Sequence, residues 1–126
     1  MSESVVTDLF RRKLAAHMAG TAVLKPIALV AFGDGGHRAD NTAKPTSSGA
    51  VGLFHEVLRK PVSAITQEGQ YTATGKGIIS SGEISSGVIS EAGLFDESGN
   101  LLCWKSFAPK YLESGESYGV NLTMRF

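Results

Sequence analysis

The chain has few of the residues that cross-link small domains and none of the long apolar runs that span membranes. Cys103 is its one cysteine in 126 residues, so no disulfide can form within the chain, and a lone thiol fits a reducing compartment. The longest apolar run, Ile27 to Phe32, is far shorter than the ~20 residues that a membrane-spanning helix needs. The N-terminus is acidic and lacks the apolar stretch of a secretory signal. These absences predict a soluble protein made in the cytosol.

An excess of charge of one sign is also missing. Twelve basic and twelve acidic residues cancel, and neither sign is strongly segregated along the chain. Proteins that bind nucleic acid or an anionic membrane usually carry a basic patch, so neither partner is expected. The densest basic run, Arg11 to Lys13, is too small for phosphate binding and is typical of the solvated face of a helix.

One domain covering residues 1–126 is expected, because this length at 42% hydrophobic composition suffices for one buried core and is too small for two. Residues 4–19 repeat apolar side chains at steps of four, which predicts an amphipathic helix. Ser4 or Thr7 suits its start, and Gly20 can close it in the left-handed conformation. The apolar stripe consists of Val6, Phe10, Leu14 and Met18.

The rest of the chain favours β structure. One strand is expected within residues 24–32, a polar exposed loop over 37–49, and one or two helical turns over Gly52–Leu58 before Pro61. Within residues 62–126 the β-prone segments are Val62–Thr66, Tyr71–Ile79, Gly87–Phe95, Leu101–Phe107 and Tyr118–Phe126.

The clearest of these segments is Val88–Phe107, where two apolar strands flank the turn-forming run Asp96–Asn100 and so predict a buried β-hairpin. The last segment, Tyr118–Phe126, alternates apolar and polar residues and predicts a strand with one buried face. The expected fold class is therefore mainly β (α+β): an antiparallel β-sandwich-like domain with an N-terminal amphipathic helix.

No catalytic, cofactor-binding or metal-binding residue is predicted. The glycine-rich run Gly33–Gly36 could cradle a phosphate, but the dinucleotide and P-loop spacings are absent, which favours a tight turn that ends a strand. Asp34, His37, Asp40 and Asn41 offer metal ligands, but their spacing fits neither the calcium loop nor a zinc pattern.

Three residues in the hairpin are weighed as structural rather than functional. Glu91 lies between apolar residues in mid-strand, where its charge needs a partner such as a backbone amide or an arginine. Trp104 is favoured as a core residue over a sugar-binding platform, and Cys103 as buried packing. The many serines mostly punctuate turns, and no Cys/His nucleophile pair is implied.

A series of short motifs, in this order, resembles the N-terminal region of bacteriophage tail fibres, the phage tail-collar fibre protein family. The match spans almost the whole chain. The motifs are Val6-Thr7-Asp8, Ile27-Ala-Leu-Val-Ala-Phe-Gly-Asp-Gly-Gly, Leu58-Arg-Lys-Pro-Val, Ile89-Ser-Glu-Ala-Gly-Leu-Phe-Asp, Gly99-Asn-Leu and Phe107-Ala-Pro-Lys.

The resemblance implies a structural virion protein, encoded by a phage or prophage, that attaches or assembles a tail fibre on the tail or baseplate by protein–protein docking. It implies no enzymatic activity and no cofactor. Its partners would be other tail or baseplate proteins and further copies of itself, for example in a trimer. Family members often continue into a longer collar or fibre region, which is absent from this sequence, so host-receptor binding is not carried over. Arg11 and Arg12 are less typical of the family and point to a helix that faces solvent or a partner.

The sequence is also compatible with two other functions. A carbohydrate-binding β-sandwich module would use exposed aromatic side chains, with Trp104 or Tyr111 as candidates. A small metal- or phosphate-dependent enzyme would be centred on residues 33–41 and would depend on Asp34 or His37.

Overall fold

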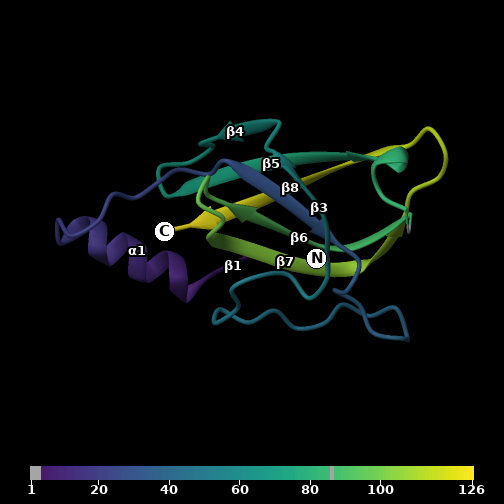
Figure 1. The fold of residues 1–126 in the computed structure, drawn as a ribbon, viewed down its shortest axis with the longest axis horizontal. Coiled ribbons are helices and arrows are strands. Elements are labelled where there is room, and N and C mark those ends of the chain that lie inside the picture. The colour runs from purple at the N-terminus through teal and green to yellow at the C-terminus, as the bar shows by residue number, and fades with distance from the viewer. Residues whose placement is uncertain (1–3, 86) are drawn as a thin grey trace.

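Two antiparallel sheets and one α-helix make up the fold in a computed structural model that describes residues 4–85 and 87–126 (Figure 1). Within these residues one sheet has five strands in the order β1-β7-β6-β2-β3, and the other has three in the order β4-β5-β8. The predicted fold class is confirmed. The strands are β1 (Val5–Val6), β2 (Leu29–Gly33), β3 (Glu56–Pro61), β4 (Ala64–Thr66), β5 (Thr72–Ser80), β6 (Val88–Phe95), β7 (Leu101–Tyr111) and β8 (Ser117–Arg125), and the helices are α1 (Asp8–Met18) and the short 3-10 helix η1 (Ser81–Glu83).

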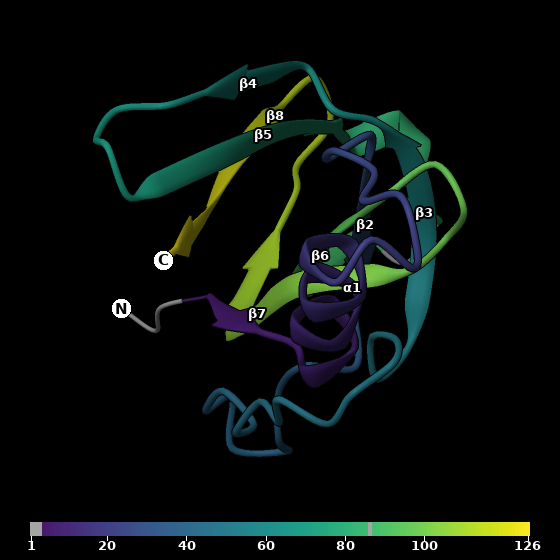
Figure 2. The ribbon, with the colours of Figure 1, turned by 90° about the vertical axis from the view of Figure 1, so that its left-hand side faces the viewer.

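The sheets face each other across an apolar core, and Figure 2 views this arrangement from the end where α1 projects. Gly77 of β5 shows how closely they approach, because a Cβ there would lie 2.7 Å from the Val30 side chain of β2. The main buried cluster joins residues of both sheets and of α1. It consists of Phe10, Val30, Phe32, Ile79, Ile84, Ile89, Ala92, Leu94, Leu102, Cys103, Val120, Leu122 and Met124.

A second apolar cluster joins Ala31, Phe95, Leu101 and Trp104 in the five-stranded sheet. The long connection between β2 and β3, here called the strap (residues 34–55), contributes Ala50 and Leu53 to it. Both faces of the hairpin strands are therefore covered, which explains why their sequences are apolar in nearly every position.

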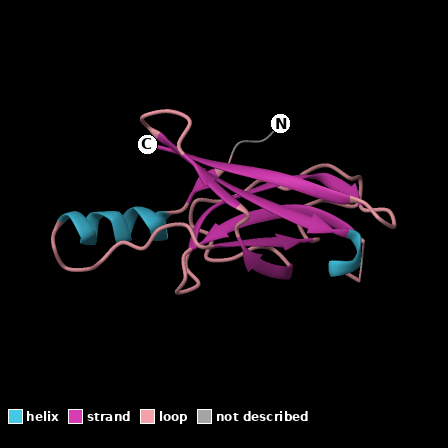
Figure 3. Ribbon diagram, turned by 90° about the horizontal axis from the view of Figure 1, so that it is seen from above, coloured by secondary structure: helices cyan, strands magenta, loops and turns pink. Residues whose placement is uncertain are grey.

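The helix is shorter than predicted. Thr7 is its N-cap: the Thr7 hydroxyl accepts the Phe10 N–H at 3.1 Å and donates to the Leu101 carbonyl at 2.6 Å. Val5 and Val6 belong instead to β1, where they pair with β7. Of the predicted stripe only Phe10 is fully buried, and Met18 is 77% exposed because α1 projects beyond one end of the sandwich (Figure 3).

The predicted hairpin is confirmed. Strands β6 and β7 pair from Val88 opposite Tyr111 to Phe95 opposite Leu101. In the turn, the Asp96 carboxylate accepts the backbone N–H groups of Ser98 and Asn100 at 3.0 Å, and Gly99 takes a φ of +87°.

The helical turns predicted over Gly52–Leu58 are wrong. Residues 56–61 form β3, which pairs along β2 from Leu29 opposite Pro61 to Gly33 opposite Glu56. The apolar spacing of Leu53, Val57 and Leu58 fits a helix face, but pairing with a buried neighbouring strand outweighs that local pattern. The expected strands within 24–32 and 62–126 are present with shifted ends.

Candidate functional site: a groove between β7 and β8

Glu91 is the most buried charged residue that the structure describes, and it serves the fold. Its side chain lies in mid-β6 at 0% exposure. One carboxylate oxygen accepts the backbone N–H of Phe54 at 2.7 Å, and the other accepts those of Gly35 and His55 at 3.0 and 2.8 Å. The predicted structural partner of this charge is confirmed as backbone amide, and those amides belong to the strap.

The glycine-rich run ends β2 at Gly33, as the sequence predicts, and the chain bends at Asp34 and Gly36. A Cβ on Gly33 would lie 2.5 Å from the Glu91 carboxylate, and one on Gly36 would lie 2.3 Å from the Ser90 carbonyl oxygen. The absent side chains therefore let the strap approach β6 and its carboxylate. The space that a phosphate would need against these glycines is filled by the protein itself.

The four candidate metal ligands lie on the strap, and the side chains of Asp34, His37 and Asp40 each contact a different partner. Asp34 Oδ1 lies 2.5 Å from His55 Nδ1, His37 Nδ1 lies 2.8 Å from the Ser90 hydroxyl, and Asp40 accepts the Thr42 hydroxyl at 2.6 Å. Across residues 4–85 and 87–126 no three His, Cys, Asp or Glu side chains gather closely enough to hold a metal ion. The Asp34 carboxylate raises the pKa of exposed His55 through their hydrogen bond and its charge.

Trp104 and Cys103 are core residues, as predicted. The indole of Trp104 is 2% exposed and donates its N–H to the Ser47 carbonyl of the strap at 3.0 Å. It is therefore closed to a sugar, whereas Tyr111 is 66% exposed. Burial raises the pKa of the Cys103 thiol to about 12, which keeps it protonated and unreactive near neutral pH.

One motif is easily overlooked in the sequence: Gly115-Glu116-Ser117-Tyr118-Gly119 matches the Gly-x-Ser-x-Gly spacing of a hydrolase nucleophile elbow. In the structure Ser117 opens β8 and pairs with Ser80 of β5. An elbow requires the serine between a strand and a helix, so this serine lacks the setting that the chemistry needs.

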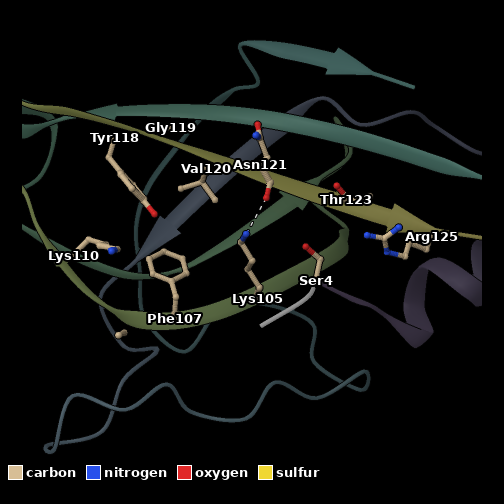
Figure 4. Close-up of a pocket in the computed structure, with 11 residues that line it drawn as sticks. Ser4, Lys105, Phe107, Lys110, Tyr118, Gly119, Val120, Asn121, Thr123 and Arg125 are labelled. Carbon is tan, nitrogen blue, oxygen red and sulfur yellow. Dashed lines mark hydrogen bonds between the residues drawn. The ribbon is translucent and has the colours of Figure 1, made fainter. Parts of the chain in front are cut away.

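A groove of about 560 Å³ lies where β7 and β8 run along the same side of the sandwich (Figure 4). Both strands are at or near the edge of their sheets there. In the described part of the chain β8 pairs with β5 alone, and β1 covers β7 only at Cys103 and Trp104. The groove is lined by Ser4, Lys105, Phe107, Ala108, Lys110, Tyr118, Gly119, Val120, Asn121, Thr123 and Arg125.

Lys105 bridges the groove. Its ammonium donates to the Asn121 carbonyl of β8 at 2.9 Å, and Figure 4 shows the side chain reaching from one strand to the other. Burial lowers the pKa of Lys105, because the charged form loses water there. Lys110 and Arg125 also line the groove, and no acidic side chain is among the described residues that do so.

The opposite side of the sandwich has a matching lysine with a different set of partners. Lys60 of β3 donates to the Ile78 carbonyl of β5 at 2.9 Å and also to both carboxylate oxygens of Glu83, at 2.9 and 3.0 Å. Glu83 in turn accepts the Ser80 N–H at 2.8 Å. That lysine is ion-paired within the chain, whereas Lys105 has a carbonyl but no carboxylate among the groove residues described.

No protein-family model matches the chain, and no curated protein matches its sequence.

Among residues 4–85 and 87–126, no helix is long and apolar enough to span a bilayer.

Proposed function

We propose that the protein is a structural phage tail protein, encoded by a phage or prophage, that attaches or assembles a tail fibre on the tail or baseplate by protein–protein docking. The observation that carries this proposal is the groove between β7 and β8, where two strand edges face one hollow. Strand edges present backbone N–H and C=O groups that a partner can pair with, and proteins that stay monomeric usually cover or blunt them.

The resemblance to tail-collar fibre proteins supports the same proposal. Its motifs fall on strands of the five-stranded sheet, on the turns that join them and on the cap of α1. One of them, Phe107-Ala-Pro-Lys, provides Phe107, Ala108 and Lys110 to the groove. The proposed docking surface and the resemblance therefore meet on the second half of β7.

Location in the particle is the direct test. Tail particles induced from the strain that encodes the chain, purified on a gradient and analysed by mass spectrometry, should contain the chain in fixed ratio to the other tail proteins. Deleting its gene should give particles without fibres. Particles that lack the chain, together with complete fibres after the deletion, would overturn the proposal.

Solution mass tests the assembly itself. Light scattering coupled to size-exclusion chromatography over a concentration series should give a discrete oligomer, for example a trimer, if copies of the chain dock on one another. A monomer throughout would leave partner subunits of the tail as the docking species.

One observation favours a carbohydrate-binding alternative: Tyr111, at the end of β7, is 66% exposed and could stack on a sugar ring. Trp104, the other aromatic candidate, is buried. This alternative predicts glycan-array binding that Tyr111→Ala abolishes and Lys105→Gln leaves unchanged.

A further inference from the structure

The outer edge of β8 has the geometry of a strand that can accept another. Antiparallel strands point alternate backbone groups to opposite sides. The Asn121 carbonyl points away from β5, toward Lys105, so the backbone groups of Gly119 and Thr123 point the same way. Over its nine residues β8 offers an edge about 30 Å long, enough for an added strand of ordinary length.

The facing edge of β7 is less suitable. Pro109 lies within the part of β7 that borders the groove and has no N–H to donate. A proline there interrupts any ladder on the β7 side. An incoming strand would therefore pair with β8 and lay its inward side chains over β7.

Two of the β7 side chains that it would meet are lysines. Within residues 4–85 and 87–126, half-buried Lys105 donates to a carbonyl and to no carboxylate, and Lys110 lies on the same strand and lines the same groove. Lys60, in the matching place on the other side, binds a carbonyl and a carboxylate together. The missing counterpart at Lys105 is thus an acidic group, and the groove residues described contain none.

Building on the proposed docking function, we infer that the groove binds an extended acidic segment of a partner protein, which adds as a strand to the outer edge of β8 while its carboxylates pair with Lys105 and Lys110. A backbone N–H of the incoming strand replaces the Lys105 ammonium as the hydrogen-bond donor to the Asn121 carbonyl. The Lys105 ammonium, released from that carbonyl, then pairs with a carboxylate, as Lys60 already does with Glu83.

A labelled peptide of alternating Glu and Thr, measured by fluorescence anisotropy against the full chain, tests this inference. The peptide should bind, while the same peptide with Lys in place of Glu should not. A version that is N-methylated at alternate residues keeps its charges but cannot form the ladder, and it should bind at least tenfold more weakly.

Protein variants test the two lysines. Lys105→Gln and Lys110→Gln should each weaken peptide binding about tenfold, the size expected for losing one charge-assisted hydrogen bond. Lys13→Gln on α1, far along the chain from the groove, is the matched control and should leave binding unchanged. Backbone amide NMR spectra of each variant establish that the fold is retained and should place the peptide-induced shifts on residues 117–125.

Four outcomes would overturn the inference. Equal binding of the N-methylated peptide would show attraction by charge alone. Equally tight binding of an oligothymidylate would make the groove a nucleic-acid site, and self-association that Lys105→Gln abolishes would make a second copy the occupant. No binding of any acidic peptide to the folded protein also excludes the inference, yet the proposed tail function would still stand or fall on the particle analysis.

Discussion

Glu91 and Lys105 are two charged side chains that the sandwich buries fully or in part, and they differ in how many hydrogen-bond partners they have. Glu91 is fully buried and both of its oxygens are engaged, by three backbone N–H groups of the strap. Lys105 is half-buried and donates to a single carbonyl across a groove. One charge meets a full set of partners from its own chain, and the other does not.

The difference separates a structural charge from one that is available to a ligand. A buried charge is tolerated only when its hydrogen-bonding capacity is satisfied. Glu91 meets that condition within the chain, so its loss should damage the fold. Lys105 meets it only in part, so its loss should spare the fold and damage binding.

The largest effect should come from Glu91→Ala. Three backbone N–H groups would lose their acceptor, and we expect the free energy of unfolding to fall by about 3 kcal/mol. Urea denaturation measures it. Glu91→Gln, which keeps one accepting oxygen, should fall between wild type and Glu91→Ala, and a loss below about 1 kcal/mol for Glu91→Ala would contradict the role given to this carboxylate.

The next largest effect should come from giving the groove its own carboxylate. Ala108→Glu places an acidic side chain on β7 between Lys105 and Lys110, where it would compete with an incoming carboxylate. Affinity for the Glu/Thr peptide should fall about tenfold, which corresponds to about 1.4 kcal/mol. Ala108→Gln has nearly the same size without the charge and should bind as wild type does. Equal weakening by both variants would point to steric obstruction instead.

A smaller effect is expected from exchanging each bridging lysine for methionine. Lys60→Met removes a partly exposed ion pair and a hydrogen bond to the Ile78 carbonyl, and should lower the free energy of unfolding by up to ~1 kcal/mol. Lys105→Met removes a partly desolvated charge that has no carboxylate partner among the described groove residues, and should change the free energy of unfolding by less than about 0.5 kcal/mol. Both values come from urea denaturation. If Lys105→Met proved the more destabilising of the two, Lys105 would be a structural residue like Glu91.

The smallest effect concerns pH: the loss of stability caused by Lys60→Met should depend on pH, and the change caused by Lys105→Met should not. Hydrogen bonding to Lys60 lowers the pKa of Glu83 below its ordinary value of 4.5. A carboxyl with a lowered folded-state pKa stabilises the protein above its unfolded-state pKa and loses that contribution as the pH falls through the folded value. The stability difference between wild type and Lys60→Met should therefore be full above pH 4.5 and shrink below it.

The comparison of wild type with Lys105→Met serves as the control for this measurement. Its difference from wild type should stay constant over the same acidic range, because the described residues that line the groove include no carboxylate. A parallel decline for both lysines would indicate general acid destabilisation and not the titration of Glu83.

Alternating patterns made much of the sheet predictable. The local apolar pattern and the turn residues predict the hairpin and the C-terminal strand. The structural role of Glu91 is predicted by the free-energy cost of placing a charge among apolar neighbours. Strands β1 and β3 were missed because their signals are not local. Val5 and Val6 are two residues whose pairing partner lies at Cys103 and Trp104, nearly a hundred residues along the chain.

The groove was missed for a similar reason. It exists only where two strands from different sheets run side by side, and no spacing in the sequence records that. Two signals for it are nevertheless present in one segment of the sequence. Lys105 is a charged residue directly after an apolar run, just as Glu91 is a charged residue within one. Pro109 has no N–H to donate, so its strand cannot be paired along its whole length on both sides. A charge and a proline in one predicted strand indicate an edge.

The strap also has a consequence for synthesis on the ribosome. Gly35, Phe54 and His55 precede Glu91 by 56, 37 and 36 residues. At ordinary rates of translation, roughly 2 to 11 seconds separate these amides from the carboxylate that will hold them. Until then the backbone N–H groups of the nascent strap lack the Glu91 carboxylate as their hydrogen-bond acceptor, and the strap is not fixed over the apolar outer side of β2. A ribosome that stalls in this interval would leave a chain prone to aggregate, so even translation through residue 91 belongs to the physical requirements of this fold.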